Sequence, residues 1–300
     1  MNNSCFAVCG DLHITEKTPV NRVDDYAKTI LTKLEFILKI AQKNKCNLFQ
    51  PGDFFDNPSP SYRLFSKVVD LLNKYNDVNI YSIFGQHCMK FRNKENTASA
   101  ALAQSCTNFI LISSTGLNIN ENITLYGSNY NEDPPEVTSI NFNVLLIHRM
   151  MIQDKLWANQ KEYTQAGSFL RVNKFNVIVS GDNHQGFICD QKTTGKHLFN
   201  CGATGRTTIA QFDHKPFIII FDIDTKKYKQ IFIPIEPSEK VFNLEKVERE
   251  KEKNENLKAF VTGLSADKEI GMKFEDNLNA FLAEINVQPD IRQIIEESKI

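Results

Sequence analysis

The stretch FNVIVSGDNH (Phe175 to His184) passes directly from an apolar run into a polar turn. The apolar part is short enough for a β-strand that is buried on both faces. Asp182 and His184 follow it two positions apart, so both side chains can contact one metal ion at the end of this strand. One such pair is weak evidence, and its meaning depends on how the other strands end.

Four other predicted strands also end in side chains that bind metals or move protons. These are Asp11 and His13 after CFAVCG, Asp53 and Asp56 after CNLFQ, Gln86 and His87 after NIYSIF, and His148 at the end of FNVLLIH. The chain has only 6 histidines, and most of them stand at these strand ends. Because the carboxyl ends of parallel strands meet at one edge of a sheet, we expect these side chains to converge.

The spacing of apolar residues predicts an α/β fold. Residues 30–41 and 64–72 carry apolar stripes at helical spacing between the first three strands, a βαβαβ order that implies parallel strands and right-handed crossovers. More short strands follow, from FILISS (109–114) to YKQIFIPI (228–235). This excess of strands over helices favours two mixed sheets packed face to face between helices.

Composition narrows the class of protein. A net charge of −1 argues against nucleic-acid binding through bulk charge and leaves a local basic patch open. No apolar run is long enough to span a bilayer, so we expect no membrane association. The 7 cysteines are scattered without CxxC spacing. We therefore predict reduced core cysteines rather than disulfides or a zinc site, and a reducing, cytoplasmic location.

The converging ligands predict a chemistry. Manganese, iron and zinc accept imidazole together with carboxylate, whereas magnesium and calcium prefer oxygen alone. Two such ions about 3.5–4 Å apart can clamp a phosphoryl group and activate a water for in-line attack. The strand ends therefore predict dinuclear phosphoester hydrolysis.

The ordered motifs GDLH, PGDFFD, GQH, a lone His148 and GDNH resemble those of the calcineurin-like metallophosphoesterase superfamily over roughly residues 5–235. The resemblance implies a four-layer αββα sandwich, and it implies a ligand set and a catalytic acid. The first metal would be held by Asp11, His13, Asp53 and His184, and the second by Asp53, Gln86, His148 and Asp182, with His87 protonating the leaving oxygen outside the coordination sphere.

Three positions depart from the family pattern. Gln86 replaces an asparagine and sets the amide oxygen back by one bond, roughly 1.5 Å. Asp182 replaces a histidine and adds a third carboxylate, which favours manganese, magnesium or iron(II) over zinc. Cys88 replaces an acid that orients the catalytic histidine, so another acid must substitute or turnover is slow. Both altered ligands remain competent donors, which favours an active variant site over a dead enzyme.

Within the superfamily, GDFFDNPSPS resembles SbcD-type DNA-repair exonucleases, and GQHCMKFR resembles phage-type members of that branch. This implies a DNA nuclease subunit of an SbcCD-type complex in the cytoplasm, or in the host cytoplasm for a phage-encoded protein. Arg92, Arg149 and Arg206 are the candidate phosphate contacts. For Lys94, an ordinary solvated surface charge is almost as good an interpretation as a phosphate contact. A small-substrate phosphatase or nucleotide phosphodiesterase and a non-catalytic scaffold remain the alternatives.

The composition of the chain changes after about Ile235, where a highly charged run begins. We expect residues 1–235 to form the phosphoesterase domain and residues 236–300 to form a charged linker with a small helical appendage. Apolar residues from Phe274 to Ile285 recur at helical spacing, and Pro289 suits the start of a second helix. This pair packs either on the core or on a partner, which the resemblance implies is an SMC-like ATPase of the SbcC type. A homodimer is the other assembly that we consider.

Overall fold

The computed structural model of the chain describes residues 4–89, 93–154 and 162–266. Contacts divide the chain into two compact units, Met1–Leu244 and Glu245–Ile300. The first unit extends past the boundary expected near residue 235, because the short helix α5 (Ser238–Val241) still belongs to it. Val241 and Phe242 are buried, and the amide of Val23 donates to the carbonyl oxygen of Val241 at 3.0 Å.

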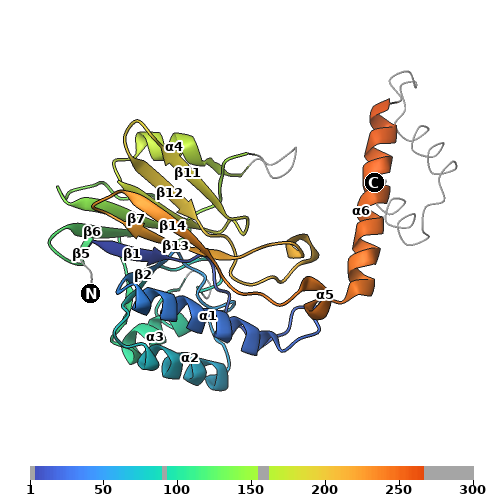
Figure 1. Cartoon of the computed structure of the whole chain (residues 1–300), viewed down its shortest axis with the longest axis horizontal. Helices are drawn as coiled ribbons and strands as arrows, with labels where there is room; N and C mark the ends of the chain where they lie inside the picture. Colours follow the sequence, from blue (N-terminus) through green and yellow to red (C-terminus); the bar gives the residue numbers. More distant parts are fainter. Residues whose placement is uncertain (1–3, 90–92, 155–161, 267–300) are drawn as a thin grey trace. The chain divides into compact units, whose positions relative to one another are not determined.

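The first unit contains two six-stranded mixed sheets (Figure 1). The strands of the first sheet are β1 (Cys5–Val8), β2 (Asn47–Gln50), β3 (Ile80–Ser82), β4 (Phe109–Leu111), β13 (Phe217–Asp222) and β14 (Lys227–Phe232). They lie in the order β14-β13-β1-β2-β3-β4, with β1 to β4 parallel and β13 antiparallel to β1. The predicted parallel βαβαβ start is therefore confirmed.

The second sheet has the order β11-β12-β10-β7-β6-β5. Its strands are β5 (Leu117–Asn118), β6 (Ile123–Ser128), β7 (Phe142–His148), β10 (Val177–Gly181), β11 (Phe187–Gln191) and β12 (Lys196–Asn200). Strands β6, β7, β10 and β12 run parallel, and the hairpin partner β11 is antiparallel. A short parallel pair, β8 (Met151–Ile152) and β9 (Thr164–Gln165), lies apart from both sheets in hydrogen bonding.

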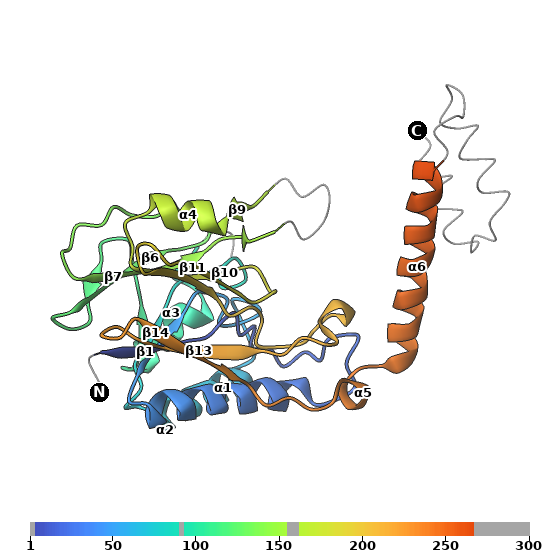
Figure 2. The same cartoon turned by 45° about the horizontal axis from the view of Figure 1, so that its top comes forward.

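Helices cover the outer faces of the two sheets (Figure 2). The first sheet is covered by α1 (Tyr26–Lys43), α2 (Tyr62–Lys74) and α3 (Ala98–Ser105), and the second by α4 (Ala166–Val172). Each of these four helices starts at a side-chain cap; for example, Asp25 accepts from the amide of Lys28 at 3.0 Å, and Ser61 accepts from the amide of Leu64 at 3.2 Å. The predicted four-layer αββα arrangement is confirmed.

Three layers of buried side chains explain why the strands read as continuous apolar runs. In β7, Val144 and Leu146 point into the layer between the sheets, whereas Leu145 and Ile147 point toward α4. Strand β1 divides in the same way, with Phe6 between the sheets and its neighbours facing α1. Because successive side chains alternate between two buried faces, the central residues of these strands are all apolar.

The prediction that all cysteines are reduced is wrong for two of them. Cys5 and Cys46 form a disulfide with a Cα–Cα distance of 5.6 Å. The parallel register of β1 and β2 pairs Phe6 with Asn47, so the preceding residues, Cys5 and Cys46, also lie side by side. This neighbour relation depends on sheet register, which cysteine spacing in the sequence does not reveal. The other five cysteines are free thiols, and all except Cys189 are buried.

The described part of the second unit is the helix α6 (Leu244–Ala266). Its first turns are rich in both acidic and basic residues, and most of these side chains are exposed, as expected for the charged run. The two predicted C-terminal helices, between residues 274 and 295, lie outside the described residues. Among the described residues, no helix combines the length and the apolar character that crossing a membrane requires.

Candidate metal centre

The predicted ligands stand on the turns that follow the carboxyl ends of parallel strands. Three of them sit in the left-handed region of backbone space, with φ of 46° for His13, 49° for Asp53 and 80° for Asp182. Residues other than glycine rarely adopt this conformation, and each instance costs on the order of 1–3 kcal/mol. Strain at three separate turns that meet at one place is typical of a functional site.

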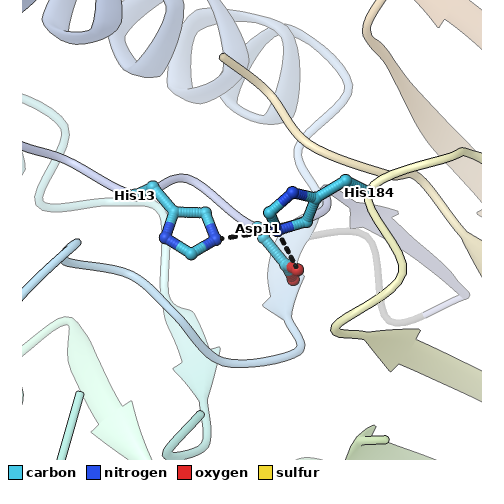
Figure 3. A group of neighbouring side chains, drawn as sticks. All are labelled: Asp11, His13 and His184. Atoms are coloured by element: carbon cyan, nitrogen blue, oxygen red, sulfur yellow. Dashed lines mark hydrogen bonds and ion pairs between the residues drawn. The ribbon is translucent and has the colours of Figure 1, made fainter. Parts of the chain in front are cut away.

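Asp11, His13 and His184 form one half of this site, here called the first half (Figure 3). The Nε2 atoms of His13 and His184 lie 3.1 Å apart. The Nε2 atom of His184 is also 3.7 Å from Oδ2 of Asp11. Two imidazole nitrogens and a carboxylate oxygen that point at one another can hold one cation.

Asp53 lies between this group and the rest of the site. Its Oδ2 atom is 3.8 Å from Nε2 of His13 and 3.3 Å from Nε2 of His148. Its Oδ1 atom accepts a hydrogen bond from the amide of His87 at 2.9 Å, which fixes the carboxylate plane. A carboxylate with one oxygen between two histidines is placed to bridge two metal ions.

Gln86, His148 and Asp182 form the second half. The side-chain amide of Gln86 donates from Nε2 to Oδ1 of Asp182 at 2.8 Å, and its Oε1 atom is buried without a hydrogen-bond partner. His148 is within 2.7 Å of the carbonyl oxygen of Pro51 through Nδ1, so Nδ1 carries the proton and Nε2 faces Asp53. A carbonyl partner of this kind orients the metal-binding histidine in many proteins.

Unpartnered buried atoms show that these residues fit a cation. Within the described part of the chain, Asp11 Oδ1 and Gln86 Oε1 are buried without a hydrogen-bond partner. Asp53 Oδ2 and His148 Nε2 also lack a hydrogen bond and face each other as an ion pair at 3.3 Å. Leaving a buried polar atom unpaired costs about 1–3 kcal/mol, more for a charged group. A cation bound here would give all four atoms a partner.

Two glycines allow the ligand turns to approach this closely. A Cβ atom at Gly181 would lie 2.5 Å from Oδ1 of Asp11 and 2.7 Å from Nδ1 of His148. A Cβ atom at Gly85 would collide with the carboxylate of Asp53. Any larger residue at either position would push a ligand out of place.

The acid–base properties of the metal-free site differ between the two halves. Burial opposes a charge on His148, but the adjoining carboxylate of Asp53, with Asp11 and Asp182 nearby, outweighs it and raises the pKa of His148 to about 9. Burial and the positive charge of His13 lower the pKa of His184 to about 4. Burial raises the pKa of Asp11 to about 7. A cation would replace these protons.

Asp56, rather than Cys88, lies next to the side chain of His87. The Nδ1 atom of His87 lies 3.1 Å from the carbonyl oxygen of Asp56 and 3.9 Å from its carboxylate, which is closer, at 3.3 Å, to Nδ1 of His13. The thiol of Cys88 instead points into the core beside the carbonyl oxygen of Phe55, and burial raises its pKa to about 11. The sequence places Asp56 at a strand end but does not reveal these contacts.

The predicted phosphate contacts have different outcomes. Arg149 lies partly exposed next to His148 and donates to the carbonyl oxygen of Glu132 at 2.9 Å. Arg206 is not available to DNA, because it is buried and its guanidinium donates to the carbonyl oxygens of Phe212 and Glu236 and to the hydroxyl of Ser238. Its side chain is structural. Arg92 lies outside the described residues.

Comparisons with known proteins agree with this site. The sequence profile of the family described as calcineurin-like phosphoesterase matches residues 6–186, more than half of the chain and the five ligand-bearing strand ends. The structure of TT1561 from Thermus thermophilus superposes with a TM-score of 0.50 at 8% identity, covering 77% of this chain and 99% of the other, which shows the shared fold. A second solved structure covers the same fractions at 11% identity and a TM-score of 0.48. A comparison with curated proteins found no match.

Proposed function

The chain belongs to the calcineurin-like phosphoesterase family, and from this premise we propose that it hydrolyses phosphodiester bonds of DNA with two divalent metal ions. The observation that supports it most is the set of unpartnered donor atoms on Asp11, Asp53, Gln86 and His148. Donors of this kind in a site without a counter-ion are poor candidates for a structural role. They also argue against a scaffold subunit, which has no reason to retain them.

In this proposal Asp11, His13 and His184 would hold one ion and Gln86, His148 and Asp182 the other, with Asp53 contributing to both. The ions would supply Lewis-acid polarisation of the phosphoryl group and a more acidic water. Three carboxylates, on Asp11, Asp53 and Asp182, favour manganese, with magnesium and iron(II) as the other candidates.

The proton transfer falls to His87. Its Nδ1 atom is engaged by Asp56, which leaves Nε2 free to give a proton to the leaving oxygen. The side chain of His87 is 43% exposed, so it can reach a substrate bound over the metals. The carbonyl oxygen of Asp56 holds the ring in place.

DNA is proposed as the substrate on the resemblance of GDFFDNPSPS to SbcD-type exonucleases. The local structure has the layout of that motif, because the turn after Asp56 leads through Pro60 to the Ser61 cap of α2. Arg149 beside the second half is the described cation best placed for a phosphate. We propose that the chain is the nuclease subunit of an SbcCD-type repair or recombination complex.

One observation favours a smaller substrate instead. The ammonium group of Lys94 forms an ion pair with Glu132, and Arg149 pairs with Asp133 at 3.3 Å. Acidic side chains beside the only cations described near the second half weaken attraction for a polyanion. A phosphatase or nucleotide phosphodiesterase acting on a small substrate is therefore the second candidate.

One set of assays separates these candidates. The purified full chain, with Mn²⁺, is given linear DNA, bis-p-nitrophenyl phosphate and p-nitrophenyl phosphate, each with and without excess chelator. A DNA nuclease cleaves DNA and the diester, whereas a phosphatase prefers the monoester. Activity that persists in excess chelator would contradict the metal centre. No turnover of any substrate by a protein that binds two metals would favour the scaffold.

The partner is proposed on resemblance as well. We propose that residues 236–300 dock the coiled coil of an SMC-like ATPase of the SbcC type. A chain truncated after about Glu250 should remain folded and cleave the small diester normally but fail to bind that ATPase. Aggregation of the truncated protein would show instead that the C-terminal helices belong to its core, and dimerisation of the full chain alone would favour the homodimer.

A further inference from the structure

The loop of residues 202–206 connects two of the ligand turns. The amide of Asp11 donates to the carbonyl oxygen of Gly202 at 3.1 Å, and the amide of Thr204 donates back to the carbonyl oxygen of Asp11 at 2.8 Å. The amide of Ala203 donates to the carbonyl oxygen of His184 at 3.1 Å. The backbone of this loop therefore fixes the distance between Asp11 and His184, two members of the first half.

Side chains from other elements hold the same loop through its carbonyl groups. Lys33, in the middle of α1, donates from Nζ to the carbonyl oxygen of Thr204 at 2.7 Å. His214 donates from Nε2 to the carbonyl oxygen of Ala203 at 2.8 Å. The amides of Thr204 and Ala203 donate to the ligand turns, and the carbonyl groups of the same two residues accept from Lys33 and His214. The two side chains therefore hold in place the loop that supports the first half of the metal centre.

Lys33 is an unusual residue for its position. Its side chain is 5% exposed, on the buried face of α1 between Ile30 and Leu34. Burial, and then the charges of Arg206 and Arg22, lower the pKa of Lys33 to about 7. A methionine would fill this space without the cost of burying an amine. The feature that a methionine lacks is the donor that reaches Thr204.

We propose that Lys33 is a positioning residue of the metal centre, which sets the affinity of the first half for its ion by holding Thr204 and, through it, Asp11. It touches neither the metal nor the substrate. Partners that orient a ligand from outside the coordination sphere typically contribute about 10-fold to 100-fold to metal affinity. Lys33 acts one hydrogen bond further away, so we expect about the lower end of that range. The inference rests on the metal centre of the proposed function and not on DNA as its substrate.

The test compares Lys33→Met with Lys39→Met, an exposed lysine of the same helix. Mn²⁺ is titrated into the metal-free full chain by calorimetry, and backbone amide hydrogen exchange is followed in residues 202–206 without metal. We expect Lys33→Met to bind one of two Mn²⁺ ions about tenfold more weakly, with faster exchange in the loop. Lys33→Gln, which keeps a shorter donor, should lie between Lys33→Met and the wild type. Lys39→Met should match the wild type.

The melting temperature of the metal-free variants separates positioning from folding. Lys33→Met should melt close to the wild-type temperature, because the removal of a buried amine offsets the loss of the hydrogen bond to the carbonyl oxygen of Thr204. Unchanged Mn²⁺ affinities in Lys33→Met and Lys33→Gln would overturn the inference while leaving the metal centre intact. A lowered melting temperature with equal weakening of both ions in both variants would also overturn it, since the role would then be structural. A wild-type chain that binds no Mn²⁺ would overturn the proposed function together with this inference.

Discussion

The two halves of the metal centre differ in the types of side chain that form them. The first half combines two imidazoles and one carboxylate, and of these only the His184 side chain is substantially exposed, at 41%, whereas Asp11 and His13 are buried. The second half combines the partly buried Gln86 and Asp182 with His148, whose side chain is 0% exposed, as is that of Asp53. The clearest contrast is therefore between the two histidines His184 and His148. Water can replace His184 but not the buried His148, so we expect the ion of the second half to bind more tightly.

The largest expected effect belongs to neither half. Replacement of His87 by alanine should reduce turnover of bis-p-nitrophenyl phosphate by about 10²–10⁴-fold, the usual contribution of a proton-transfer group. Both metals should remain bound, because His87 contacts the site through its backbone amide and through Asp56. Metal content measured on the purified variant checks this. Loss of an ion would show that His87 is a metal ligand and would contradict the division of the site into two halves that do not include it.

Removing one histidine from each half compares the halves directly. His148→Ala should weaken the second ion by more than about 100-fold, because it leaves Asp53 buried and unpaired. His184→Ala should weaken the first ion by roughly tenfold, since water can replace an exposed ligand. Calorimetric titration of the metal-free proteins with Mn²⁺ gives both values. Equal losses in the two variants would show that the difference in burial has no consequence for affinity.

A smaller effect is expected from the acid that supports His87. Asp56→Asn keeps the size of the side chain and removes its charge, so turnover should fall by roughly tenfold. Cys88→Ala is the matched control and should leave turnover within about twofold, since the thiol faces the core. A larger loss of turnover in Cys88→Ala than in Asp56→Asn would show that Cys88, and not Asp56, orients His87.

The dependence of metal affinity on pH should also differ between the halves. In the metal-free protein the pKa of His148 is about 9, so the second ion must displace a proton at neutral pH. Its apparent affinity should fall by up to about tenfold for each pH unit below 9. In the first half, His184 with a pKa of about 4 adds no such dependence between pH 6 and 9, and Asp11 with a pKa of about 7 adds it only below about pH 7. Mn²⁺ titrations at several pH values within this range measure both affinities. If neither affinity changes with pH, the expected difference between the two halves is wrong.

Much of the fold could be predicted from the sequence. The predicted strands and the first two helices are present because their apolar patterns have distinct periods, and each strand of the core is buried on two faces. The seven candidate ligands could also be predicted, because each stands at the end of such a strand. Contacts that link Asp11, His13, Asp53, Gln86, His148, Asp182 and His184 show that the structure brings them together.

Other features depended on the relative placement of distant segments. Cys5 and Cys46 are joined because the register of β1 and β2 aligns them. Arg206 is buried rather than free for a phosphate because the segment of residues 236–238 covers it. The apolar periodicity of α1 does not reveal why Lys33 lies on its buried face. The carbonyl oxygen that accepts its hydrogen bond belongs to Thr204, which is 171 residues away in the sequence.

The sequence by itself determined which side chains stand at the strand ends and therefore the chemistry of the site, because local apolar patterns set where each strand stops. Only the tertiary structure decided how those side chains divide the work. Position in three dimensions placed Asp56 beside His87, buried His148 while leaving His184 partly exposed, and turned Arg206 toward the core. The reason is physical: burial, charge separation and hydrogen-bond direction are properties of contacts between segments, and they arise only when the two sheets pack.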